Sequence, residues 1–193
     1  MESTRTYSAD TEAALWQQVA ADLALEENQY EYRAELLQGG YRINFELDID
    51  LGGGFEGGYE LTTFSAVVPG QPSFHFALHE QDWVHELGKL LGLTDVELGD
   101  PDLDAAFIIT TNDAVALRML LNESAVRATL LKYQELRLTL APASHEPGAE
   151  VLLTFTKEEG ITDPAQLQEI YHMLYLLLQR LTPASAGTAI SNR

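Results

Sequence analysis

The stretch that decides the fold is residues 30–50, YEYRAELLQGGYRINFELDID. Apolar and polar residues alternate on both sides of the pair Gly39-Gly40. A period of two places successive side chains on opposite faces of a strand, and a glycine pair is typical of a tight turn. The stretch therefore predicts an antiparallel hairpin with one buried and one wet face. In its second strand we expect burial of Tyr41, Ile43, Phe45, Leu47 and Ile49, and exposure of Arg42, Asn44, Glu46 and Asp48.

Further strands are expected outward from this hairpin. Residues 59–68 and 73–78 follow the glycine-rich turn 52–58, and residues 106–111 form a short apolar run. A second alternation pairs residues 136–140 with residues 151–155 across the loop 142–148, which predicts another hairpin.

Helices are indicated by apolar residues spaced three and four apart. The first covers residues 11–25 with Asp10 as its N-cap, and others cover residues 81–91, 113–121 and 123–133. The last begins at Asp163, with Pro164 in its first position, and carries an apolar stripe as far as Leu181.

These elements predict an α+β fold in the order α-β-β-β-β-α-β-α-α-β-β-α. An antiparallel sheet should carry its helices mainly on one face. The length suits a single domain over residues 1–182, followed by a small, polar and flexible tail over residues 183–193.

Charge narrows the class of partner. The chain has 30 acidic and 11 basic residues, a formal net charge of −19. Nucleic acids and anionic membranes would be repelled, because both are bound through Lys and Arg. An acidic surface suits a basic protein partner, although it also serves solubility alone.

The chain has no cysteine, which removes disulfides, thiolate metal sites and cysteine nucleophiles. Residues 1–10 are polar and lack the apolar core of a signal peptide, and no apolar run is long enough to span a bilayer. We therefore expect a cytoplasmic protein.

Two stretches that begin with His-Glu match the first part of a zinc-peptidase motif, but both lack its second histidine. His79-Glu80 is followed by Trp83 where the second histidine belongs, and His85-Glu86 by Lys89. His75 and His79 would lie ~13 Å apart on a strand, too far to share one ion. No metal, cofactor or catalytic residue is assigned.

Three alternate carboxylates, Asp100, Asp102 and Asp104, occupy the first positions of a calcium-loop pattern. Ala105 stands where that loop needs glycine, and Thr111 where it needs a bidentate glutamate. The structural alternative is that Asp100 caps a short helix, with Pro101 in its first position and further acids near its positive end. The turn is thus a structural or an interaction feature.

The stretch from Gly99 to Ile109, GDPDLDAAFII, followed by Asn112-Asp113 and residues 117–121, resembles a motif of uncharacterised bacterial domains. Those domains carry G-D-P-x-F-D-x-x-F-x-V, so Leu103 and Ile109 are conservative changes here. The resemblance implies a fold and no activity. The order of elements also resembles that of type III secretion chaperones, which bind extended client segments, usually as dimers.

The leading expectation is a non-catalytic protein-binding or scaffold module, as a monomer or homodimer. A chaperone-like binder of a client segment is the first alternative, and an enzyme with an unrecognised active site is the second. A binding module should expose an apolar patch or an open sheet edge.

Overall fold

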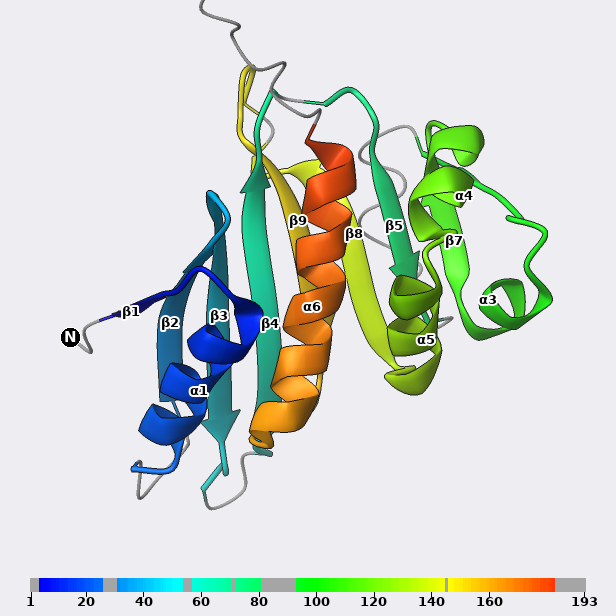
Figure 1. Cartoon of the computed structure of the whole chain (residues 1–193). Helices are drawn as coiled ribbons and strands as arrows, with labels where there is room; N and C mark the ends of the chain where they lie inside the picture. Colours follow the sequence, from blue (N-terminus) through cyan, green and yellow to red (C-terminus); the bar gives the residue numbers. More distant parts are fainter. Residues whose placement is uncertain are drawn as a thin grey trace, which may run out of the picture.

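The computed structural model describes residues 4–25, 31–53, 57–70, 72–80, 93–144 and 146–182. They form an α+β fold built on one nine-stranded, mostly antiparallel sheet in the order β1-β2-β3-β4-β9-β8-β5-β7-β6 (Figure 1). The strands are β1 (Arg5–Ser8), β2 (Glu31–Gln38), β3 (Tyr41–Asp50), β4 (Tyr59–Val68), β5 (Phe76–His79), β6 (Thr94–Asp95), β7 (Ile108–Thr111), β8 (Leu136–Pro142) and β9 (Val151–Lys157). The helices are α1 (Glu12–Leu23), α3 (Pro101–Ala106), α4 (Ala114–Leu121), α5 (Ser124–Lys132) and α6 (Pro164–Leu181). The predicted fold class is confirmed.

The first hairpin has the predicted parity. In β3, Ile43, Phe45 and Leu47 are buried, and Arg42 and Asn44 are exposed. Tyr41 and Ile49, expected to be buried, are partly buried, and Glu46 and Asp48, expected to be exposed, are only partly exposed. The turn pairs Gln38 with Tyr41, so Gly39 and Gly40 are its two central residues, both with positive φ. The second hairpin is also confirmed, since β8 and β9 pair in antiparallel register.

Helix α6 lies across the middle of the sheet, with α1 and α5 beside it on the same face (Figure 1). Its N-cap is Asp163, whose side chain accepts a hydrogen bond from the amide of Ala165, and Pro164 stands in the first turn as predicted. The apolar stripe is buried against the core as far as Leu178, whereas Leu181 is only partly buried. The buried residues are Leu167, Ile170, Tyr171, Met173, Leu174, Leu177 and Leu178.

Two strands were not predicted. β1 pairs in parallel with β2. The sequence of residues 1–10 did not indicate this strand, because four residues are too few to establish a period. β1 is held by contacts with distant residues: Arg5 forms an ion pair with Asp22 at 3.2 Å, and Tyr32 bonds Tyr7 at 3.2 Å. β6 has only two residues and pairs with β7.

Three predicted boundaries are wrong. The strand expected over residues 73–78 begins only at Phe76, because the backbone of Ser73 and His75 bonds the side chain of Asn112 instead.

The other two concern the cap of a helix and the start of a strand. The N-cap of α1 is Thr11, which accepts a hydrogen bond from the amide of Ala14, and Asp10 lies outside the helix. The strand expected over residues 106–111 begins only at Ile108, because the short helix after Asp100 continues to Ala106.

The helix predicted over residues 81–91, the centre of the glycine-rich turn 52–58 and the tail 183–193 lie outside the described residues. In the described part of the chain, no helix is long and apolar enough to cross a membrane.

The two glycines of the first turn provide a stability test. A Cβ on Gly39 would lie 2.4 Å from the hydroxyl of Tyr175 on α6, whereas a Cβ on Gly40 meets nothing within 4 Å. Gly40→Ala should cost about 1–2 kcal/mol for its positive φ. Gly39→Ala should cost about 1–3 kcal/mol more, through overpacking.

Tyr175→Phe in the Gly39→Ala background should recover part of that difference, because it removes the clashing oxygen. Urea unfolding measures the free energy of unfolding of the unmodified protein, Gly39→Ala, Gly40→Ala and the double variant Gly39→Ala with Tyr175→Phe. Equal losses of stability for Gly39→Ala and Gly40→Ala would show that Gly39 does not pack closely against Tyr175 of α6.

Candidate functional site

The Asp100 turn has the predicted N-cap geometry. Asp100 accepts hydrogen bonds from the backbone amides of Asp102 and Leu103, at 3.1 and 3.3 Å, and Pro101 is the first residue of α3. Asp104 bonds in the opposite direction, accepting from the amides of Leu98 and Gly99 at 2.8 Å each. The second carboxylate thereby fixes the chain that enters the helix.

A cation that sequence reasoning missed completes the turn. The guanidinium of Arg127, on α5, forms ion pairs with both Asp100 and Asp102, and its Nη2 lies 2.9 Å from Oδ1 of Asp100. The hydrogen bond from Arg127 holds the pKa of the Asp100 carboxyl below its usual value, and the amides of Leu103 and Asp102 add to that effect. The turn thus joins α3 to α5.

The three carboxylates of this turn do not converge. Asp100 and Asp102 are directed to Arg127, and Asp104 is directed to the backbone on the other side. Nowhere among the described residues do three or more His, Asp or Glu side chains gather in a way that could hold a metal ion.

Two of the described histidines, His79 and His75, hydrogen-bond to nearby backbone or amide groups. His79, at the end of β5, is buried and bonds the carbonyl of Glu80 through Nδ1 at 2.7 Å. The backbone amide of His75 donates to the side chain of Asn112 at 2.8 Å. His85 lies outside the described residues.

A different feature stands out on the surface, at the end of α6. Met119 and Val115 are 69% and 64% exposed although both are large and apolar. They are four residues apart on α4, so they lie on one face of that helix. Beside them is a mainly apolar groove of about 460 Å³. It is lined by Pro72, Phe74, Ala116, Met119, Leu120 and Leu181, with Arg180 at its border.

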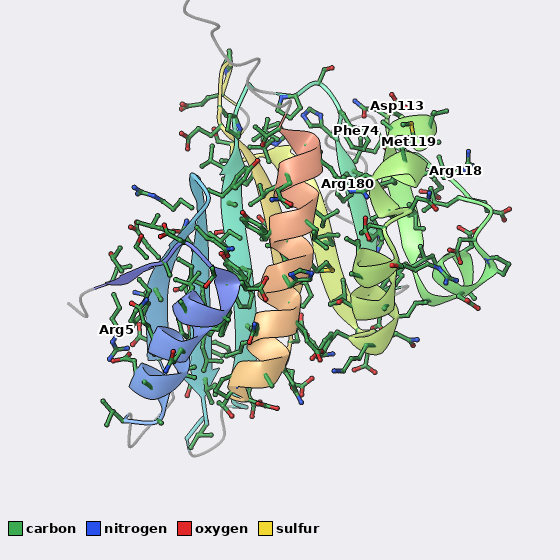
Figure 2. All side chains as sticks on the ribbon, in the orientation of Figure 1. Arg5, Phe74, Asp113, Arg118, Met119 and Arg180 are labelled. Carbon is green, nitrogen blue, oxygen red and sulfur yellow. The ribbon has the colours of Figure 1, made fainter. Side chains whose placement is uncertain are left out.

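Three separate parts of the chain form this groove. Figure 2 shows Phe74, Met119 and Arg180 close together where the last turn of α6 meets α4. Arg180 holds the junction, because it bonds the carbonyl of Met119 at 3.3 Å and pairs with Glu123. At the other end of α4, Asp113 caps the helix by accepting from the amides of Val115 and Ala116 at 3.1 and 2.9 Å. The exposed apolar side chains therefore stand on a firmly anchored helix.

The exposed residues of α4 could have been noticed in the sequence. The buried stripe of that helix is Leu117, Leu120 and Leu121, and Val115 and Met119 lie off it. Apolar residues on the solvent-facing side of an amphipathic helix indicate a contact surface, and this pattern can be seen in the sequence. The contribution of Phe74 and Leu181 depends on tertiary structure and has no such indication.

No protein-family model matches the chain, and no curated protein resembles it significantly.

Asp100 is both the N-cap of α3 and an ion-pair partner of Arg127, and substitutions can separate these two roles. Asp100→Ala loses the cap and the ion pair, so it should destabilise the protein most. Asp100→Asn and Asp100→Ser keep a capping oxygen and lose the charge, so they should fall between Asp100→Ala and the unmodified protein. Thermal unfolding of the three variants measures the order.

The pH dependence follows from the direction of the pKa shift. A carboxyl whose pKa is lowered on folding contributes stability above its unfolded pKa and loses it as the pH falls through the folded value. Arg127→Gln should therefore reduce stability at pH 7, with a smaller loss below about pH 4, the ordinary carboxyl range. An unchanged difference between pH 7 and pH 3 would contradict this account.

Proposed function

We propose that the protein is a non-catalytic protein-binding module, whose docking surface is the groove between α4 and the end of α6. The observation that carries the proposal is the exposure of Met119 and Val115 beside that groove. Large apolar side chains are usually buried, and a contiguous exposed group of them is typical of an interface.

The residues of the groove fit a protein partner better than a small polar ligand. Its lining is mostly hydrocarbon, with a thioether from Met119 and a single aromatic ring from Phe74. Methionine is common at surfaces that accept varied apolar side chains, because its unbranched chain adapts to them. One or two apolar anchors from an amphipathic helix would fill such a groove.

The net charge of the chain indicates which charged residues should lie beside the apolar anchors of that partner. With a net charge of −19, the protein attracts a segment that carries Lys and Arg, and repels an acidic one. The occupant we propose is an amphipathic basic segment: its apolar residues enter the groove, and its basic residues are attracted by the net negative charge of the chain.

A chaperone-like binder of an extended client is the second candidate. It is favoured by β1, a four-residue strand at one edge of the sheet. An extended client would add to such an edge through backbone hydrogen bonds, rather than through an apolar anchor in the groove.

The test uses two designed amphipathic peptides that share their leucines and differ only in having Lys or Glu at every polar position. Calorimetry should show that the Lys peptide binds and that salt weakens the binding. Met119→Gln should lower the affinity at least about tenfold, because a central anchor typically carries that much of the interaction.

The matched control is Leu25→Gln, which replaces another exposed apolar residue, 80% exposed, by the same polar one. It should bind as the unmodified protein does. Equal binding by Met119→Gln and Leu25→Gln would reject the groove as the site, and equal binding of the two peptides would reject a basic partner. Affinity purification from the native host, with both variants alongside, then identifies the partner as the protein lost only with Met119→Gln.

A further inference from the structure

A second hollow, of about 740 Å³, lies where β3 ends and β4 begins. Two of its lining residues, Leu51 and Tyr59, are large and yet 67% and 52% exposed. Every charged residue that lines it in the described part of the chain is acidic. These residues are Asp50, Glu60, Glu158 and Glu159. The hollow therefore offers exposed apolar area and negative charge together.

The strand register decides which carboxylates lie beside the ring of Tyr59. Asp50 is its direct partner across β3 and β4, so the two side chains leave the sheet on the same face. Asp48, two residues earlier on β3, shares that face. Glu60 has the alternate parity, and its carboxylate accepts from the amide of Gly160 at 3.0 Å. The acidic pair next to the ring is thus Asp48 and Asp50.

The other two glutamates of the hollow already have cations beside them. Glu159 pairs with Lys157 at 3.4 Å, and the charge of Glu158 acts on the guanidinium of Arg137. Asp48 and Asp50, by contrast, form no ion pair with any residue that the structure describes; each accepts one hydrogen bond from an uncharged group. A cation that enters the hollow can therefore pair with them.

The ring of Tyr59 is held in place by one of these carboxylates. Its hydroxyl donates to Oδ2 of Asp48 at 3.0 Å. This hydrogen bond and the charge of Asp48, with weaker contributions from Asp50 and Glu31, raise the pKa of Tyr59 above its usual value. The ring is therefore a neutral, fixed surface in a negative field, and a cation is attracted to the face of such a ring.

Asp50 also positions Leu51 at the border of the hollow. Its Oδ1 accepts a hydrogen bond from the amide of Gly52 at 2.8 Å, which turns the chain at Leu51. A Cβ on Gly58 would lie only 2.2 Å from the carbonyl oxygen of Asp50, so the two sides of the hollow approach closely at this glycine. The second carboxylate oxygen of Asp50 remains as an acceptor for a further donor.

We propose that this hollow binds an arginine side chain of a basic segment from a protein partner. The guanidinium stacks on Tyr59 and pairs with Asp50 and Asp48, while the hydrocarbon stem lies against Leu51. A planar guanidinium suits both contacts, since it stacks on aromatic rings and donates paired hydrogen bonds to carboxylates. Exposed apolar side chains beside the charges favour a protein partner, because tyrosine and arginine are enriched at protein interfaces.

This inference deepens the proposed function: it rests on a basic protein partner and assigns the place where one of its arginines binds. The test compares two capped peptides by calorimetry, one of alternating glycine and arginine and one with citrulline, the neutral isostere, in place of arginine. The arginine peptide should bind. The citrulline peptide should bind at least about tenfold more weakly, since the charge-assisted contacts are lost.

Neither peptide has an apolar anchor for the groove at α4, so Met119→Gln should leave the binding of the arginine peptide unchanged. Tyr59→Ser should lower the affinity at least about tenfold, and Tyr59→Phe should keep most of it, because the ring remains. The matched control is Val67→Ser, which removes another exposed side chain of the same parity on β4 and should bind as the unmodified protein does.

Asp50→Asn supplies a second test should Tyr59→Ser fail to fold. Asparagine keeps an acceptor for the amide of Gly52 and removes only the charge. Its control is Glu35→Gln, which removes the same charge on β2, where Glu35 pairs with Arg42. Asp50→Asn should weaken binding of the arginine peptide, and Glu35→Gln should leave it unchanged.

Four results would each overturn the proposal. They are no binding of the arginine peptide, equal binding of the citrulline peptide, equal effects within either pair of variant and control, and a loss of binding with Met119→Gln. Spermidine is tested as a competitor of the peptide. If it bound more tightly than the arginine peptide, the hollow would be a site for a free polyamine, and the assignment to a protein partner would be wrong.

Discussion

The arrangement of this protein depends on the burial of α6 across the sheet. Every residue of its apolar stripe as far as Leu178 is almost inaccessible to solvent, and the polar residues beside the stripe tie the other elements to it. Glu12 of α1 contacts His172 at 2.7 Å, and the hydroxyl of Tyr133, after α5, donates to Glu169 at 2.7 Å. The same carboxylate pairs with Lys132, and the two hydrogen bonds lower the pKa of Glu169. α6 thus determines where α1 and α5 lie, and through α5 the position of Arg127 and the Asp100 turn.

The proposed docking surface depends on the same helix. α6 ends at Arg180 and Leu181 in the apolar groove. Arg180 bonds the carbonyl of Met119 and pairs with Glu123, so the end of α6 also fixes α4, which carries the exposed apolar side chains.

The sequence predicted well those features that follow from local periodicity. The parity of β3, the pairing of the second hairpin and the cap of α6 each depend on a few neighbouring residues, and all were confirmed. β1 was missed because its four residues gain their order from Asp22 and Tyr32, which lie further along the chain. The burial of Lys157, on the apolar parity of β9, was not predicted, because its partners, the carbonyl of Gln134 and the carboxylate of Glu159, lie outside the strand. The groove required Phe74 and Leu181, which come from different parts of the chain.

The position of β4 next to β9 has a consequence for how the chain folds. This pair lies inside the sheet, yet it joins residues such as Thr62 and Lys157 that are far apart in the sequence. At a synthesis rate of 5–20 residues per second, the edge of β4 waits roughly 5–20 s for its partner strand to leave the ribosome. If β1–β4 and α1 pair during that time, the edge of β4 that later meets β9 stays unpaired, and the apolar face that α6 later covers stays exposed, because α6 is made even later. Correct folding in the cell therefore depends on keeping that edge from other chains until β9 arrives.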